Sequence, residues 1–183
     1  MMIWALSALS GLGFLAIFIL ALCAPRLGYG RYWPPEQSQS WQHTSFRALF
    51  RLGLYPLVAV SALIARDVGF SMPILGGSMI VIGFGAALAF TGKLGWKQAF
   101  GRAEGLVTTG PYALSRNPVY VATWLALLGW AICVPHAAVL GPLALWAVLY
   151  LIAPFWEEPW LEERFGTAFI EYKKTTPRFF FGL

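Results

Sequence analysis

Long apolar runs, separated by short polar segments, make up most of this chain. A helix needs about 20 residues to cross a hydrocarbon layer of roughly 30 Å, and backbone groups in lipid pair most readily within a helix. Runs of this kind occur at residues 3–23, 46–65, 72–91, 119–134 and 136–156. The pattern therefore predicts an all-α fold, a polytopic membrane helical bundle with about five transmembrane helices.

The last two apolar runs are short, and only Pro135 and His136 join them. We expect them to form a helical hairpin that turns at or just inside the far membrane surface. A broken pair of this kind often borders a cavity in a membrane protein. The first run is expected to be a retained helix, because no basic segment precedes it and no A-x-A cleavage site follows it.

After Pro159 the apolar positions take the spacing of one helix face. That face carries Leu161, Phe165, Phe169 and Tyr172, while most of the charged residues lie away from it. The pattern predicts a C-terminal amphipathic helix that ends at Pro177. Such a helix either lies on the cytoplasmic membrane surface or folds back over the ends of the spans.

Composition and charge place the protein in the membrane and orient it. Hydrophobic residues make up 58% of the 183 residues and charged residues only 11%, which excludes an ordinary soluble domain. Of the 13 Lys and Arg residues, all but Arg66 flank the first connection, the third connection or the tail. The positive-inside rule then predicts an N-terminus outside the cell and a cytoplasmic C-terminal tail.

No internal repeat or low-complexity linker divides the chain. We therefore expect one membrane domain over residues 1–183, with three spans in residues 1–104 and the chemistry in residues 105–183. The net charge of +5 is explained by basic residues beside anionic lipid headgroups, and no nucleic-acid motif is present. His43 and His136 are predicted on opposite membrane faces, outside any Cys/His cluster with metal spacing. We expect contact with membrane lipids, but neither nucleic acid nor a metal ion as a partner.

The strongest chemical signal is a polar segment at residues 110–120, G-P-Y-A-L-S-R-N-P-V-Y, together with an acidic pair, Glu157 and Glu158. A hairpin of the last two spans would bring both to one mouth of the bundle. Arg116 offers a cation for a carboxylate, and the two glutamates offer anions for an amine or ribose hydroxyls. Tyr120 adds an aromatic face, and a helix start within the segment adds free backbone N–H groups. This set suits a zwitterionic nucleoside cofactor better than a metal ion or a phosphate.

A simpler interpretation of the same residues stays open. Arg116 could extend to the cytoplasmic headgroups, Asn117 could cap a helix that begins at Pro118, and Tyr120 could be an interfacial aromatic. The acidic pair weakens this interpretation, because ionisable groups near the bilayer are costly unless they are partnered or functional.

These segments resemble a known family, the integral membrane methyltransferases of the isoprenylcysteine carboxyl methyltransferase and phospholipid methyltransferase type. The family pattern is G-x-Y-x-x-x-R-H-P-x-Y before a helical hairpin, then E-E-x-x-L-x-x-x-F-G-x-x-Y-x-x-Y and a closing P-R. This chain has the first segment at residues 110–120, E-E-P-W-L-E-E-R-F-G-T-A-F-I-E-Y at 157–172 and P-R at 177–178. The resemblance covers residues 105–180. Two positions depart from it, with Asn117 at the usual His and Phe169 at a frequent Tyr.

The resemblance implies an S-adenosylmethionine-dependent methyltransferase that acts within the membrane on a lipophilic acceptor. The cofactor would bind at the cytoplasmic mouth between the hairpin and the C-terminal helix, and the acceptor would enter from the bilayer. The positions that match the motif, and would bind the cofactor, are Tyr112, Arg116, Asn117, Pro118, Tyr120, Glu157, Glu158 and Tyr172. Among them the candidates for catalysis are Arg116, Asn117 and Glu158.

The resemblance also implies roles for these side chains. Arg116 would hold the carboxylate of the cofactor's methionine or of the acceptor, and Glu157 or Glu158 would hold the ribose or the amino group. Asn117 can hydrogen-bond a cofactor but cannot titrate near neutral pH, so a general base at the family's His would be lost. The acceptor stays open among an isoprenylcysteine-like carboxylate, a phospholipid amine and a thiol. An ammonium acceptor would first lose a proton, to Glu158 or Tyr120.

Two other functions stay open from the sequence. Membrane sterol reductases resemble this family at their C-terminal end and bind NADPH, although a 2'-phosphate favours more arginines than this mouth offers. A non-catalytic membrane scaffold or transport protein would account for the missing His. No ionisable residue lies in the middle of a predicted span, which disfavours an ion path across the bilayer.

Overall fold

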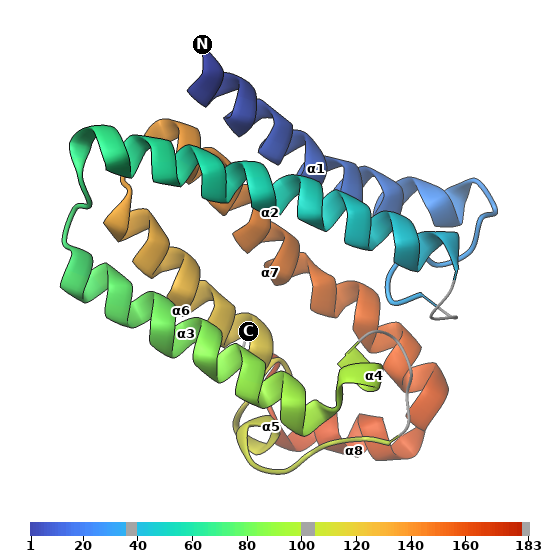
Figure 1. Ribbon diagram of the computed structural model, residues 1–183. Coiled ribbons are helices and arrows are strands. Elements are labelled where there is room, and N and C mark those ends of the chain that lie inside the picture. Colours follow the sequence, from blue (N-terminus) through green and yellow to red (C-terminus); the bar gives the residue numbers. More distant parts are fainter. Residues whose placement is uncertain (36–39, 100–104, 181–183) are drawn as a thin grey trace.

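A computed structural model describes residues 1–35, 40–99 and 105–180 of the chain, and these residues form helices and loops without a strand (Figure 1). In chain order the helices are α1 (Met2–Arg26), α2 (Trp41–Val68), α3 (Pro73–Leu94), α4 (Trp96–Ala99), α5 (Pro111–Leu114), α6 (Pro118–Cys133), α7 (Ala137–Phe165) and α8 (Thr167–Thr175). Four of them, α1, α2, α3 and α7, are long and apolar enough to cross a membrane, and α6 is a shorter apolar helix. The predicted helical membrane bundle is confirmed. The predicted division after residue 104, and Arg102 of the third connection, lie outside the described residues.

The long helices pack in two groups. Helix α1 packs against α2 and α7, and α3 packs mainly against α6 (Figure 1). Bulky apolar side chains fill the first group, with Phe14, Leu57 and Val139 fully buried between its helices. The second group is held by close backbone contact instead, because a Cβ atom on Gly83 would lie 2.5 Å from the backbone nitrogen of Ala126. Small residues at helix crossings allow this approach in membrane proteins.

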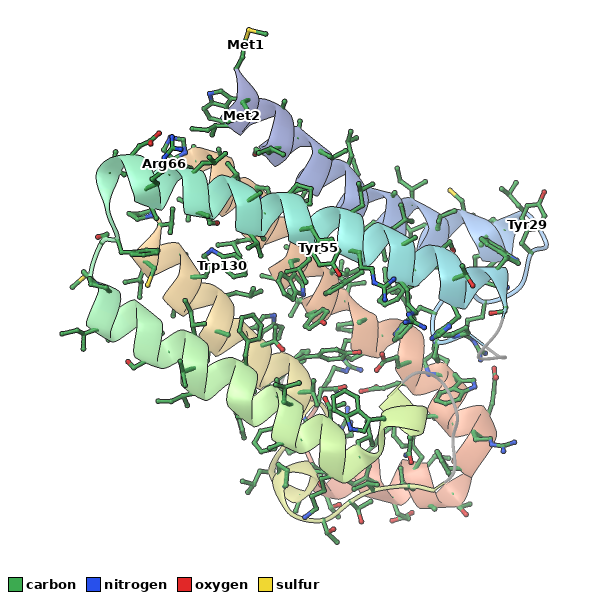
Figure 2. The ribbon with its side chains drawn as sticks, viewed as in Figure 1. Met1, Met2, Tyr29, Tyr55, Arg66 and Trp130 are labelled. Carbon is green, nitrogen blue, oxygen red and sulfur yellow. The ribbon has the colours of Figure 1, made fainter. Side chains whose placement is uncertain are left out.

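The expected hairpin of the last two spans is formed by α6 and α7, joined at residues 134–136. Its two helices separate from the turn onward, since α6 follows α3 and α7 follows α1 (Figure 1). Near the turn the groups are tied together, because the indole N–H of Trp130 on α6 donates to Ser61 Oγ on α2 at 2.9 Å. Figure 2 shows Arg66 and Met1 at this end of the molecule and Tyr29 at the opposite end. The two helix groups are thus joined at one end and diverge toward the other.

The C-terminal helix differs from its prediction. Helix α7 continues through Pro159 to Phe165, and the amphipathic face after it belongs to the separate helix α8. The break occurs at Gly166, whose φ of 54° and ψ of −129° suit a residue without a Cβ atom. The single helix predicted from Pro159 to Pro177 was therefore wrong in its boundaries. Helix α8 buries Phe169 and Tyr172 and lies across the end of the bundle beside α5 (Figure 1).

The first connection also packs more deeply than an interfacial loop would. The side chain of Tyr32 is fully buried, and its hydroxyl lies 3.2 Å from Ser45 Oγ. Trp33 stacks on Phe46 of α2, with ring centroids 4.2 Å apart. This segment therefore covers the diverging end of the bundle and contributes side chains to its interior.

Candidate functional site

A cavity of about 590 Å³ lies between the diverging helices, at the end of the bundle opposite Arg66. Its volume is typical of small-molecule sites. Most of its wall is apolar and comes from both helix groups, with Phe50 on α2, Leu88 on α3 and Leu149 on α7. Charged and polar side chains also line it, from α2, from the start of α6 and from α7. We call it the large cavity.

The polar segment before α6 owes its shape to glycine and to local hydrogen bonds. Gly110 has a φ of 65°, and Pro111 begins the short helix α5 directly after it. Ser115 is extended and fully buried, and its Oγ accepts the backbone N–H of Asn117 at 3.1 Å. Pro118 then occupies the first turn of α6, where its missing N–H is no loss. The backbone therefore directs the side chains of residues 116 and 117 toward the end of the bundle.

Arg116, Glu158 and Arg178 form a buried ion-pair cluster, which we call the tail clamp. Arg116 Nη2 lies 2.9 Å from Glu158 Oε1, and Arg178 Nη2 lies 2.7 Å from Glu158 Oε2. The side chains of Arg116 and Glu158 are 9% and 7% exposed. Hydrogen bonds to Glu158 raise the pKa of the Arg178 guanidinium further above its usual range. Arg116 is therefore not extended to lipid headgroups, and Glu158 is neutralised from two sides.

Further bonds join the tail to the polar segment. Arg116 Nη1 donates to the backbone carbonyls of Lys173 and Thr176, and the Arg116 backbone N–H donates to Pro177 O at 2.9 Å. Asn117 Nδ2 donates to Arg178 O at 3.2 Å, so Asn117 begins α6 without a side-chain cap bond. The tail is thus fixed across the start of α6 by both side chains and backbone.

Two buried tyrosines extend the same junction. The Tyr172 hydroxyl donates to Tyr112 O, and the Tyr112 hydroxyl donates to Phe90 O at 3.3 Å. Burial raises the pKa of Tyr172 to about 12, so its hydroxyl remains a donor at every physiological pH. These bonds hold α8 against α5 and the end of α3.

The Glu157 side chain takes different partners from that of Glu158, because adjacent helix residues point about 100° apart. Its Oε1 accepts the Trp33 indole N–H at 2.6 Å and also the Tyr120 hydroxyl. In the described residues, no hydrogen bond reaches its Oε2. Glu157 also lines the large cavity, so its carboxylate has unused acceptor capacity beside that space.

The eight positions predicted from the motif meet at this end of the bundle. Six line the large cavity: Tyr112, Arg116, Asn117, Pro118, Tyr120 and Glu157. Glu158 and Tyr172 line a smaller cavity of about 60 Å³, which adjoins the first and shares Arg116 and Glu157 with it. The structure thus confirms their proximity, whereas their roles stay predictions.

Sequence reasoning did not identify several residues that line the large cavity or hold its wall. Trp33 lies in the first connection, far along the chain from its partner Glu157, and no motif marks it. Arg47 and Arg51 line the large cavity from α2, but in the sequence they counted only toward membrane orientation. Arg178 belongs to the closing P-R of the motif, and that pattern could have indicated its part in the tail clamp.

Some of these side chains fit the cofactor implied by the resemblance. The open oxygen of Glu157 suits an amine or ribose hydroxyls, and Asn117 Oδ1 is an acceptor on the same wall. Trp96, Trp156 and Trp160 also line the large cavity and supply faces for a base. Among the residues that the structure describes, no group of three or more His, Cys, Asp or Glu side chains could hold a metal ion.

Comparisons with known proteins match the chain to a methyltransferase family and to two metal-resistance proteins. The family described as phospholipid methyltransferase matches residues 71–168. The chain is 31% identical over 143 residues to the nickel-cobalt-cadmium resistance protein NccN of Alcaligenes xylosoxydans xylosoxydans, a match that covers 74% of this chain and 67% of that protein. It is 39% identical over 100 residues to the cobalt-zinc-cadmium resistance protein CzcN of Cupriavidus metallidurans, covering 52% of this chain and 45% of that protein. No solved structure matches the chain.

Proposed function

Because the chain belongs to the phospholipid methyltransferase family, we propose that it transfers a methyl group from S-adenosylmethionine to a lipophilic acceptor in the large cavity. The observation that carries this proposal is the position of Glu157, which lines a cavity with apolar and aromatic walls and whose Oε2 has no hydrogen bond among the described residues. Such a space can hold a polar cofactor at its mouth and an apolar chain deeper inside.

In this proposal the cofactor is held by the wall that carries the motif. Glu157 Oε2 would accept from the cofactor's amine or ribose hydroxyls, and Trp33 and Tyr120 hold the carboxylate in place through its Oε1. Asn117 would hydrogen-bond the cofactor through Oδ1 or through the second N–H of Nδ2, because one N–H of Nδ2 already donates to Arg178 O. When bound, the cofactor supplies an electrophilic methyl group on a sulfonium, which leaves as a neutral thioether.

We propose that Arg116 and Glu158 act as positioning residues. The guanidinium of Arg116 already donates to Glu158 and to two backbone carbonyls, which leaves little capacity for a ligand carboxylate. The tail clamp instead fixes the start of α6, and with it Asn117 and Tyr120. Holding two reactants at the right distance can supply much of the acceleration of a displacement reaction.

The acceptor determines whether a base is needed. A carboxylate or a thiolate attacks without losing a proton, whereas an ammonium group loses one first. The Tyr120 hydroxyl donates to Glu157 on the cavity wall, so Tyr120 would take the ammonium proton while passing its own proton to the Glu157 carboxylate. The apolar walls exclude water, which would otherwise solvate the nucleophile. An acceptor with a long apolar chain would occupy the compartment lined by Phe50 and Leu149.

The protein is an integral membrane protein, and we propose that the large cavity lies at its cytoplasmic side. Arg47 and Arg51 line the cavity, Lys93 at the end of α3 lies beside Gly110, and the basic tail packs against Arg116. Arg66 lies at the opposite end of the molecule from Tyr29 (Figure 2). This distribution follows the positive-inside rule. Cysteine labelling from either side of the membrane tests it, with single cysteines in place of Arg66 and Lys174.

The names of the two relatives favour a second, compatible proposal, that methylation by this protein supports resistance to divalent metal ions. Both relatives are metal-resistance proteins, and the NccN match covers 74% of this chain. A strain that lacks the protein should then grow poorly on nickel, cobalt or cadmium. Wild-type protein should restore growth, and the Glu157→Gln variant should not. Equal growth of all these strains would contradict this second proposal.

Transfer of a labelled methyl group tests the main proposal. Membranes containing the protein are incubated with S-adenosylmethionine that carries a tritiated methyl group, and the organic extract is analysed for labelled lipid. We expect label with the wild-type protein and with Asp67→Asn, whose site is remote and exposed. With Glu157→Gln we expect much less label at a cofactor concentration near the wild-type Kd. Equal labelling by membranes with and without the protein would contradict the proposal for those acceptors.

A further inference from the structure

Arg47 and Arg51 are two cations in the wall of the large cavity that serve no role in the arrangement described so far. They lie four residues apart on α2, so both face the cavity one turn apart. In the described residues, Arg31, Arg66, Arg116 and Arg178 each contact a carboxylate, and Arg47 and Arg51 contact none. Two neighbouring guanidiniums without a carboxylate repel each other, and an anionic ligand between them would relieve this.

The backbone of Arg51 lies deeper along α2 than that of an arginine at the membrane boundary. Arg66 lies near the far end of α2, fifteen positions after Arg51. This spacing corresponds to a rise of about 22 Å along the helix. The hydrocarbon layer is roughly 30 Å thick. If Arg66 lies at the far headgroups, the Cα atom of Arg51 therefore lies inside the hydrocarbon layer. The Cα atom of Arg47 lies about 28 Å along the helix from that of Arg66, close to the boundary of the hydrocarbon layer on the cavity side. An arginine within the hydrocarbon is expensive unless it faces a polar partner or a wet cavity.

The surroundings of the two arginines specify what the ligand looks like. The same stretch of α2 contributes Phe46 and Phe50 to the cavity, and α3 contributes Leu88 from across it. Helices α2 and α3 belong to different packing groups, and both contribute side chains to the wall of the cavity. A ligand that fits this part of the cavity has an anionic group and an apolar chain.

Charge separates this ligand from the cofactor. Glu157 lies on the α7 wall and repels an anion, whereas Arg47 and Arg51 attract one on the α2 wall. The match to the methyltransferase family begins at residue 71, so the two arginines lie outside the part that the family shares. The shared part would hold the shared cofactor, and α2 is left to contact the acceptor.

We infer that Arg47 and Arg51 form a subsite for the anionic group of the acceptor, a phosphate or a carboxylate on an amphiphilic molecule. This inference rests on the proposed function, since it names the acceptor class for that reaction. Guanidinium groups bind both kinds of anion through paired, charge-assisted hydrogen bonds. The apolar chain of the acceptor lies against Phe46 and Phe50, and its anionic group fixes how far it enters.

Binding of simple amphiphiles tests the subsite directly. The full-length protein in an uncharged maltoside detergent is titrated with dodecyl phosphate, dodecanoate, dodecanol and inorganic phosphate. Tryptophan fluorescence reports binding, because Trp33, Trp96 and Trp156 line the cavity. The double variant Arg47→Gln, Arg51→Gln is compared with wild type, with Arg51→Lys and with Arg66→Gln, which alters a paired arginine at the other end of α2.

We expect the double variant to bind dodecyl phosphate and dodecanoate about tenfold more weakly or worse, and dodecanol as wild type does. Arg66→Gln should match wild type, Arg51→Lys should recover part of the affinity, and inorganic phosphate should bind far more weakly than dodecyl phosphate. Equal loss with Arg66→Gln, equal loss for dodecanol, or equal binding of inorganic phosphate would each overturn the subsite.

The cofactor is titrated in parallel, so that the two proposals can fail separately. Affinity for S-adenosylhomocysteine should be the same in the double variant and in wild type. A loss of that affinity with unchanged amphiphile binding would assign the arginines to the cofactor and overturn the inference. Wild-type protein that binds dodecyl phosphate but no S-adenosylhomocysteine would refute the methyltransferase proposal and leave the anion site in place.

Discussion

Glu157 and Glu158 are neighbours on α7, and they lie in regions of opposite character. On the side of Glu158, the tail clamp pairs every charge, with two guanidiniums on one carboxylate. On the side of Glu157, the large cavity holds an open carboxylate oxygen and two arginines without a carboxylate partner among the described residues. Buried charges that are paired hold a structure together, and charges left without partners at a cavity are placed to bind something else. The comparison assigns stability to one side and ligand binding to the other.

The largest effect is expected in the tail clamp. Glu158→Gln removes the counter-charge of Arg116, whose side chain is only 9% exposed, and also that of the partly exposed Arg178. Breaking such a largely buried pair costs about 3–5 kcal/mol of unfolding free energy. Thermal unfolding in detergent measures this loss. Glu162→Gln is the matched control, because its bond to Lys173 is half-exposed and contributes at most about 1 kcal/mol. Equal stability of the Glu158→Gln and wild-type proteins would remove the distinction between the two regions.

For Glu157→Gln we expect the opposite result to that for Glu158→Gln, with little change in stability and a large loss of cofactor affinity. The variant keeps an amide oxygen for Trp33 and Tyr120, so its Tm should stay close to that of wild type. Its affinity for S-adenosylhomocysteine should fall about tenfold to a hundredfold, because a charged acceptor for the amine or ribose is lost. Binding is measured by calorimetry on the folded variant. A large loss of stability with full affinity would place Glu157 with the tail clamp.

Trp33→Phe sharpens the comparison on the cavity side. The variant keeps an aromatic ring against Phe46 but cannot donate to Glu157 Oε1. We expect a loss of affinity for S-adenosylhomocysteine of about fivefold, close to the 1 kcal/mol of one hydrogen bond. Trp41→Phe is the control, because Trp41 lies outside the large cavity and is exposed. The same change in both variants would show that Trp33 acts only through packing.

The smallest expected effect is the loss of stability in Tyr172→Phe. The stability of this variant should also depend less on pH than that of wild type. Loss of the bond to Tyr112 O should cost about 1 kcal/mol. The pKa of Tyr172 is raised to about 12 in the folded protein, above its ordinary value of 10, so its contribution is complete below pH 10 and lost as the pH rises through 12. Thermal unfolding between pH 8 and pH 12 should therefore decline less steeply in Tyr172→Phe. An identical decline in both proteins would show that Tyr172 ionises freely.

The sequence predicted the parts of the fold that depend on local pattern. Hydropathy identified the spans, and the motif with the predicted hairpin brought residues near 116 and near 157 to one mouth. These predictions succeeded because apolar runs and helix starts are properties of short segments. The start of the C-terminal helix at Pro159 was wrong, because α7 continues through that proline and the chain breaks at Gly166.

The remaining contacts depend on distant segments, and no local pattern marks them. The bond from Trp33 to Glu157 joins residues 124 positions apart, and it forms only because the first connection folds over the cavity. Arg116 and Glu158 both appeared as free ligands in the sequence, but in the structure each satisfies the other. Arg51 resembles any basic residue beside a span until the cavity wall is known.

Calorimetric titration of the wild-type protein in detergent with S-adenosylhomocysteine, with NADPH as the paired control, tests the central claim most directly. Micromolar binding of S-adenosylhomocysteine alone is the expected result, because Glu157 in the cavity wall suits an amine and ribose hydroxyls and the family match is to methyltransferases. Binding of NADPH alone would favour a reductase, and no binding of either compound to the folded protein would contradict a cofactor site beside Glu157.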